Sequence, residues 1–127
     1  MYKRGVKALI LLLCAAGLAA GQNHEGNFII RFEPTADLQA KVQIPFAIHV
    51  VDDRHKPVLN ATVTLQIETP QKTEVSVYKA TGTEPGVYVA KPVFPSKGEW
   101  SVYVEVHQGE RMTTRTIDFH VPESANP

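Results

Sequence analysis

Residues 100–119 read WSVYVEVHQGERMTTRTIDF, with apolar side chains at alternate positions on both sides of Gln-Gly-Glu-Arg. Alternation of this kind is typical of a half-buried β-strand. Gly109 stands at the first position of a two-residue hairpin turn, where the backbone needs a positive φ. The stretch therefore predicts two antiparallel strands in which Gln108 lies opposite Arg111.

This register aligns the apolar residues of the two strands. It places Trp100 opposite Phe119 and Val102 opposite Ile117, and a slip of one residue would send these side chains to opposite faces of the sheet. Two independent pairs thus support the same register. Nearer the turn, the register directs two polar side chains toward the core, those of Thr113 and Arg115. We therefore expect the tip of the hairpin to be solvated or bulged.

The same alternation recurs upstream at a spacing of roughly ten residues, between turns rich in Pro, Gly and Asp. It predicts five further strands, over residues 28–32, 42–51, 61–68, 74–79 and 87–94. Residues 81–86 contain two glycines and a proline and are predicted to form a loop. After residue 22 no stretch has apolar residues repeating every 3.6 positions, the period typical of an amphipathic helix. Seven short strands without helices predict an all-β fold, an immunoglobulin-like antiparallel β-sandwich.

The N-terminal residues have the pattern of a secretory signal peptide. A basic start, residues 1–7, precedes an uncharged apolar run, residues 8–20, that ends in small side chains. This pattern predicts a signal peptide over 1–21, with cleavage after Gly21, and a periplasmic or secreted protein. A retained membrane anchor is the alternative, although a spanning helix needs about 20 apolar residues.

Cleavage would divide the chain into a mobile lead-in at 22–27, a domain at 28–122 and a tail at 123–127. It would also remove the one cysteine, Cys14, so that no disulfide forms and packing alone stabilises the domain. The expected centre of the core has five large side chains: Phe46, Leu65, Tyr88, Trp100 and Phe119.

The charge of the mature domain restricts its partners. The whole chain has 13 Lys and Arg against 13 Asp and Glu. Three of the basic residues lie in the signal peptide, so the mature domain carries a net charge of about −3. A mildly acidic surface argues against binding nucleic acid or anionic lipid through charge.

The residues expected of an enzyme are not found. Nucleophilic catalysis needs Ser or Cys beside a base, with a third group that orients the base. The sequence has no Gly-x-Ser-x-Gly, no His-Glu-x-x-His and no Gly-rich phosphate loop. The adjacent acids Asp52 and Asp53 lie in a turn, where Asp side chains bond the local backbone. We therefore predict that the protein is not an enzyme and needs no cofactor.

One pair of side chains could bind a metal ion. In the hairpin register His107 lies directly opposite Met112 on the outer face, which brings their Cβ atoms to about 4.5–5.5 Å. Imidazole and thioether ligands suit a soft ion such as Cu(I). Two ligands do not complete a site, and His24 in the lead-in is a candidate for a third. The alternative is that His107 and Met112 are ordinary surface residues at the end of a hairpin.

Several segments resemble a known family. They are FAIHVVD at 46–52, KPV at 56–58, ATVTL at 61–65, GVYVA at 86–90, FP at 94–95 and GEWSV at 98–102. Together they are similar to the YtkA-like/FixH-like domain family over about residues 28–122. The resemblance implies an extracytoplasmic immunoglobulin-like domain without catalytic activity. Relatives are often associated with copper handling or oxidase maturation and carry Met and His between the third and fifth strands, where this chain has TPQKTE at 69–74.

These observations predict a non-enzymatic exported domain that is a structural or protein-binding module of the bacterial cell envelope. Its expected partner is another envelope protein, bound through an edge strand or through the outer sheet face that carries Tyr103, Glu105 and Thr116. The alternative is a periplasmic accessory protein for copper handling or oxidase maturation. We expect no nucleic-acid partner and, after signal cleavage, no membrane span.

Overall fold

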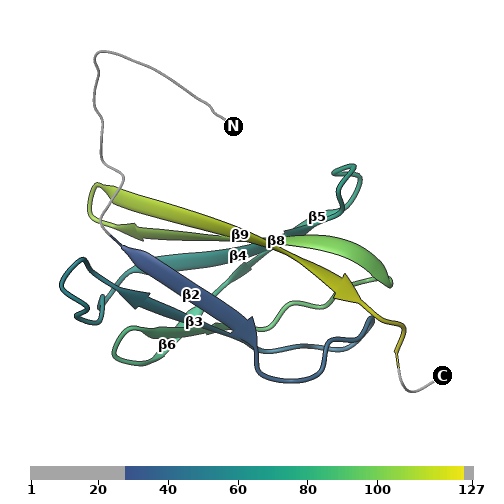
Figure 1. Ribbon diagram of the computed structural model, residues 1–127, viewed down its shortest axis with the longest axis horizontal. Helices are drawn as coiled ribbons and strands as arrows, with labels where there is room; N and C mark the ends of the chain where they lie inside the picture. The colour runs from purple at the N-terminus through teal and green to yellow at the C-terminus, as the bar shows by residue number, and fades with distance from the viewer. Residues whose placement is uncertain (1–27, 125–127) are drawn as a thin grey trace, which may run out of the picture.

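The computed structural model describes residues 28–124, which form two four-stranded antiparallel sheets packed face to face (Figure 1). The first sheet has the order β2 (Ile29–Pro34), β3 (Phe46–Val51), β7 (Val87–Ala90) and β6 (Thr81–Glu84). The second sheet has the order β5 (Val75–Lys79), β4 (Thr62–Glu68), β8 (Gly98–Gln108) and β9 (Arg111–Val121). The predicted all-β sandwich is confirmed.

The predicted signal peptide, the lead-in, Cys14 and His24 lie outside the described residues. Between residues 28 and 124 there is no helix, and so none with the length and apolar character to cross a membrane.

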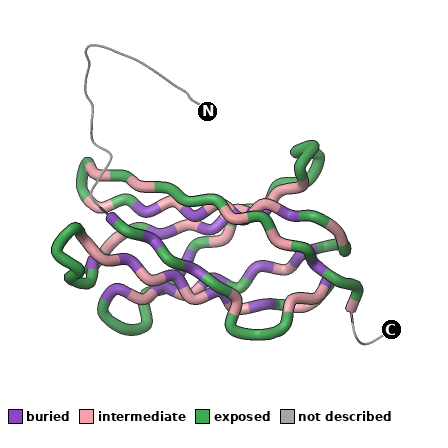
Figure 2. Tube along the Cα trace, in the orientation of Figure 1, coloured by how far each residue is buried: buried purple, intermediate pink, exposed green. Residues whose placement is uncertain are grey.

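Buried and exposed residues alternate along the strands, and the buried ones face the space between the sheets (Figure 2). Phe46, Leu65, Tyr88 and Trp100 are buried as predicted. Each such side chain contributes about 1.5–3 kcal/mol or more through the apolar surface that it removes from water. Phe119 is only half-buried, because it lies on the edge strand β9, and it packs edge-on against Phe46 with 5.6 Å between ring centroids.

The C-terminal hairpin has the predicted register. Trp100 pairs with Phe119, and the ladder continues unbroken to Gln108 and Arg111 at the turn. Gly109 has a φ of 62°, while Glu110 has no positive φ, which matches a type II′ turn.

The tip of this hairpin is solvated rather than bulged: its ladder is unbroken, and Met112, Thr114 and Arg115 are exposed. The inward guanidinium of Arg115 donates a hydrogen bond of 2.6 Å to the carbonyl of Ile30 in the first sheet. Arg115 is therefore satisfied by the backbone of another strand, which alternation along its own strand does not reveal. The hydroxyl of Thr113 is buried without a partner among the described residues.

The prediction of a loop at 81–86 is wrong for its first part. Residues Thr81–Glu84 form β6, in which Thr81 pairs with Val89 and Gly82 with Tyr88, before a bulge that precedes Glu84. All four residues of β6 are exposed, so the strand has no apolar alternation that sequence could display. The described residues thus form eight strands where seven were predicted.

Two predicted strands are shorter than expected because prolines interrupt them. The range 42–51 becomes β3 at Phe46–Val51, directly after Pro45, and the range 87–94 becomes β7, which ends before Pro92. Proline has no N–H to donate to a ladder. Beyond the prolines the pairing of these segments continues only as an isolated bridge between Gln43 and Val93.

The Tyr88 hydroxyl fixes the connection from β3 to β4. It donates a hydrogen bond of 2.8 Å to the carbonyl of Val58 and accepts one of 3.1 Å from the N–H of Ala61. This buried side chain of the first sheet thus holds the chain where it passes to the second sheet.

Candidate functional site

Strand β5 is an edge of the second sheet, and its ladder shows which backbone groups face outward. Two hydrogen bonds flank the strand, from Ala80 N to Val63 O at 2.8 Å and from Thr69 N to Glu74 O at 3.1 Å. In an antiparallel ladder, residues that bond the neighbouring strand alternate with residues that do not. Within β5, the residues that bond β4 are therefore Ser76 and Tyr78. The residues whose N–H and C=O groups point to the open side are Val75, Val77 and Lys79.

These three outward-facing residues also carry exposed side chains. Val75 is 50% exposed and Val77 is 61% exposed, on the outer face of the sheet opposite Glu68 and Gln66. An edge strand with free backbone groups and exposed apolar side chains is a template for another strand. The β5 edge combines both properties over its five residues.

The open edge of β2 in the first sheet is blocked. A bond of 2.9 Å from Thr35 N to Pro45 O fixes the alternation, so Ile30 and Phe32 direct their backbone groups outward. The guanidinium of Arg115 donates a hydrogen bond to the Ile30 carbonyl, and the strand ends at Pro34. Charged side chains and prolines are devices by which natural proteins prevent edge pairing.

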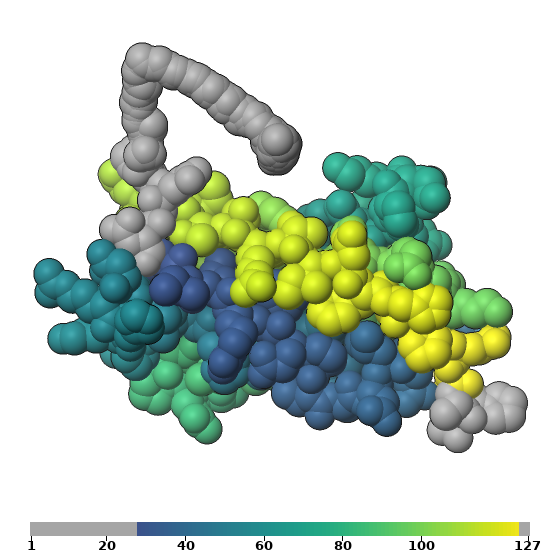
Figure 3. Space-filling view, in the orientation of Figure 1, coloured from purple at the N-terminus to yellow at the C-terminus, as the bar shows by residue number. Residues whose placement is uncertain are grey.

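The other two edges are protected in different ways. The bulge interrupts β6, whose side chains are exposed and polar. Strand β9 lies against β2, where Figure 3 shows the yellow C-terminal strand along the blue N-terminal one. Outward positions of β9 carry charged or ionisable groups such as Asp118 and His120. Among the four edges of the described sheets, β5 is the one with two exposed apolar side chains at successive outward positions and no such block, whereas on β9 Met112 is the single exposed one.

The outer face of the second sheet carries a chain of polar side chains along β8. Tyr103 donates a hydrogen bond of 2.7 Å to one carboxylate oxygen of Glu105, and the Nε2 atom of His107 bonds the other oxygen. The bond from His107 and then that from Tyr103 hold the pKa of Glu105 below its usual value. Burial, and next the bond to Glu105, raises the pKa of the Tyr103 hydroxyl. The face is a connected polar surface centred on a carboxylate.

The two predicted metal ligands lie opposite each other. His107 pairs with Met112 in the ladder, and both side chains are exposed. No group of three or more His, Cys, Asp or Glu suited to a metal ion occurs in the part of the chain that the structure describes. His24, the candidate third ligand, lies outside that part. The register thus brings the pair together, while metal binding itself stays a prediction.

Two other histidines also lie beside carboxylates on outer faces. His49 is 3.4 Å from Glu33, and the Nδ1 atom of His120 is 2.7 Å from Glu99. Period-2 alternation places these residues on outer faces of the sheets. It does not indicate which histidine lies beside which carboxylate, since that depends on the register between strands.

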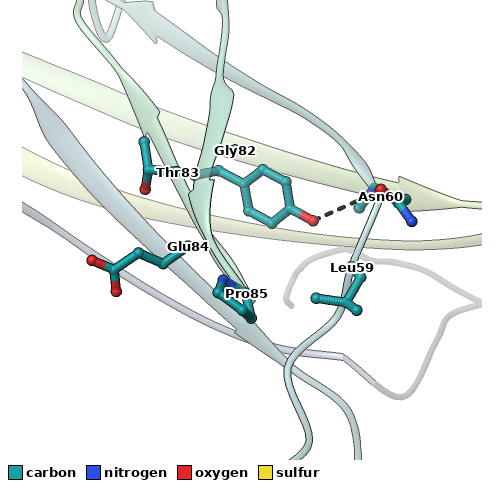
Figure 4. Close-up of a pocket in the computed structure, with 9 residues that line it drawn as sticks. Leu59, Asn60, Gly82, Thr83, Glu84 and Pro85 are labelled. Carbon is teal, nitrogen blue, oxygen red and sulfur yellow. Dashed lines mark hydrogen bonds between the residues drawn. The ribbon is translucent and has the colours of Figure 1, made fainter.

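A pocket of about 490 Å³ opens beside Tyr88, between the segment at Leu59 and the β6–β7 turn (Figure 4). The Tyr88 hydroxyl in its wall already makes two hydrogen bonds. Gly86 has a φ of 77°, and a Cβ there would lie 2.8 Å from Pro57, so only glycine fits. The Tyr88 hydroxyl and Gly86 therefore have structural roles: they fix the β3–β4 connection and the β6–β7 turn against each other.

Sequence reasoning missed the importance of β5. Among the five strands predicted upstream of the hairpin, the one at 74–79 has the fewest apolar residues, and alternation places Val75 and Val77 on one side of it. Alternation shows which residues share a face, but it does not show which strand lies at an edge. The signal that could have indicated an edge is the low apolar content of this short strand next to a polar turn.

Comparison with known proteins identifies the family. A model of the YtkA-like family matches residues 25–105. The crystal structure of a DUF4426 family protein from Pseudomonas aeruginosa is similar with a TM-score of 0.53 and 13% identity, over 78% of this chain and 94% of that one. At this identity the likeness supports the fold alone. A search of curated proteins gives no match. Because the family model covers well over half of the sequence, the chain belongs to the YtkA-like family.

Proposed function

We propose that this protein is a non-enzymatic, exported module that binds an extended segment of another envelope protein at β5. The supporting observation is the β5 edge, where the backbone groups of three residues point outward beside two exposed valines. In strand addition, main-chain hydrogen bonds supply affinity and alternate side chains supply specificity. The N-terminal signal pattern supports a periplasmic or secreted location.

The size of the edge predicts a transient complex. Each outward residue offers one donor and one acceptor, and each hydrogen bond contributes a net ~0.5–1.5 kcal/mol. Ordering an extended segment offsets much of this gain. We therefore expect a dissociation constant roughly in the micromolar range, the affinity of many reversible contacts.

Amide hydrogen exchange tests this proposal directly. The probe is a synthetic peptide, acetyl-Thr-Val-Thr-Val-Thr-Val-amide, added to the ¹⁵N-labelled domain. We expect the amides of Val75, Val77 and Lys79 to exchange quickly in the free domain and to become protected when the peptide is added. The amides of Ser76 and Tyr78, which bond β4, should be protected in both states.

The matched variants are Val77→Pro and Val77→Thr. Proline at this position leaves the ladder to β4 intact but removes an outward N–H, so the peptide should no longer protect β5. Threonine keeps the N–H and should retain protection with weaker affinity. If the peptide protects β9 instead, or if Val77→Pro binds it as well as the wild type does, the proposal is wrong.

We propose copper handling as a second candidate function, because His107 and Met112 are direct cross-strand neighbours. Nε2 of His107 bonds Glu105, so Nδ1 is the ring atom available to an ion unless that bond breaks. The test is a Cu(I) titration of the mature domain against a competing chelator. If the His107→Ala, Met112→Ala double variant binds Cu(I) as tightly as the wild type, this candidate is eliminated.

A further inference from the structure

A second pocket, of about 580 Å³, lies at the end of β5, where the chain crosses from the second sheet to the first. It is lined by Tyr78, Lys79, Thr81, Thr83, Val89 and Lys91. The lining contains two lysines and no carboxylate. On a domain whose net charge is about −3, this is a locally basic site.

The two lysines of this basic pocket are available to a ligand. Within residues 28–124 the ion pairs to carboxylates come from other residues, such as Lys97, and neither Lys79 nor Lys91 takes part in one. The Tyr78 hydroxyl is already bonded to the backbone of Val93, and the Thr83 hydroxyl to that of Val87. The charged groups are thus the unused recognition elements of the pocket.

The basic pocket continues the β5 edge. Lys79 is the last residue of β5 and also one of the three residues whose backbone groups point outward. A strand that pairs with Val75 and Val77 must therefore pass beside Lys79. Lys91 reaches the same pocket from the end of β7, so an acidic group at this point of an added strand faces two cations.

We infer that the segment bound at β5 is an apolar strand with an Asp or Glu side chain at its N-terminal end, held by Lys79 and Lys91. This inference rests on the proposed strand addition and specifies the chemistry of its partner. Added strands pair more stably in the antiparallel direction, which puts the N-terminal end of the segment beside the C-terminal end of β5. Charge complementarity then sets the register of the segment along the edge.

Peptides that differ in one residue test the inference. The probes are acetyl-Glu-Thr-Val-Thr-Val-Thr with a fluorophore attached through a C-terminal amide bond, and the same peptide with Gln in place of Glu, both measured by fluorescence anisotropy at low salt. We expect the Glu peptide to bind the wild type roughly three- to tenfold more tightly, a ratio that added salt reduces. Lys79→Gln and Lys91→Gln should each diminish this preference.

The control variant is Lys97→Gln, which removes a lysine that pairs with Glu123 away from the pocket and should keep the full preference. Equal binding of the Glu and Gln peptides would overturn the inference but leave strand addition standing. A stronger preference for Glu at the C-terminal end would overturn it too, since the added strand would then run parallel to β5. If neither the Glu peptide nor the Gln peptide binds, both strand addition and this inference are overturned.

Discussion

The guanidinium of Arg115 donates a hydrogen bond of 2.6 Å to the carbonyl of Ile30 and so joins the last strand of the sandwich to the first. The carbonyl belongs to the open edge of β2, because the alternation of the β2–β3 ladder turns the backbone of Ile30 outward. One side chain therefore blocks an edge of one sheet and connects that sheet to the other. On the opposite side of the sandwich, where Ala80 alone separates β5 from β6, no equivalent block covers β5.

Removal of this connection should destabilise the domain. We expect Arg115→Ala to lower the free energy of unfolding by about 1 kcal/mol, the typical net value of a hydrogen bond at a partly exposed site. Urea denaturation followed by the fluorescence of Trp100 measures the change. Arg31→Ala is the control, because the Arg31 side chain is 64% exposed and its Nε atom lies 3.9 Å from Glu33, so its loss should change little. Equal effects of the two variants would contradict the role assigned to Arg115.

Adjacent positions on β5 should respond differently to proline. Val77→Pro removes an N–H that points to solvent, so its cost in stability should stay within about 1 kcal/mol. Ser76→Pro removes an N–H that bonds β4, and it should cost about 3 kcal/mol or more. Thermal unfolding of the two variants distinguishes them. If Ser76→Pro is the milder change, the alternation of hydrogen bonds along β5 is opposite to that described.

The buried Tyr88 hydroxyl should contribute more to stability than a hydroxyl on the outer face of a sheet. Tyr88→Phe leaves the carbonyl of Val58 and the N–H of Ala61 without their shared partner, at a cost of about 1–3 kcal/mol. Tyr103→Phe removes a hydroxyl from the outer face, where water can replace the bond to Glu105, and should cost less. Calorimetric melting temperatures provide the comparison, and a larger loss for Tyr103→Phe would argue against the anchoring role of Tyr88.

Stability should depend on pH through Glu105. Its pKa lies below the usual 4.5 because His107 and Tyr103 bond the carboxylate, so the folded state binds this proton less readily than the unfolded state. The stabilisation is therefore full above the usual pKa and is lost as the pH falls through the lowered one. In urea titrations, Glu105→Gln should be less stable than the wild type near neutral pH and should approach it in acid. If the difference in free energy of unfolding between the wild type and Glu105→Gln becomes larger in acid, the stabilising role of the Glu105 carboxylate is wrong.

Sequence patterns predicted the hairpin because its information is local. The glycine at the turn and the apolar pairs on either side specify a register that extends over all eleven residues of β8 and β9. The same register correctly placed His107 opposite Met112 and directed Arg115 inward. It could not reveal the partner of Arg115, since Ile30 is 85 positions away in the sequence and belongs to the other sheet.

The β5 edge and the basic pocket could not be predicted from the sequence for a related reason. The apolar alternation of a strand reports which face is buried, whereas its neighbours depend on the order of strands in the sheet. Strand β6 has no buried side chain at all, and only its hydrogen bonds to β7 define it. Lys79 and Lys91 come together because β6 and β7 fold back between them, a geometry that residue types alone do not encode.

The seam between β2 and β9 also bears on how the domain would respond to force. The two strands run in the same direction along one side of the sandwich, so the start of β2 and the end of β9 lie at opposite ends of it (Figure 1). Tension applied through the two termini would therefore act lengthwise on these strands, as shear across the Arg115 bond. The β5 side would lie outside the line of load, so a tethered domain could be stretched while its free edge keeps its shape.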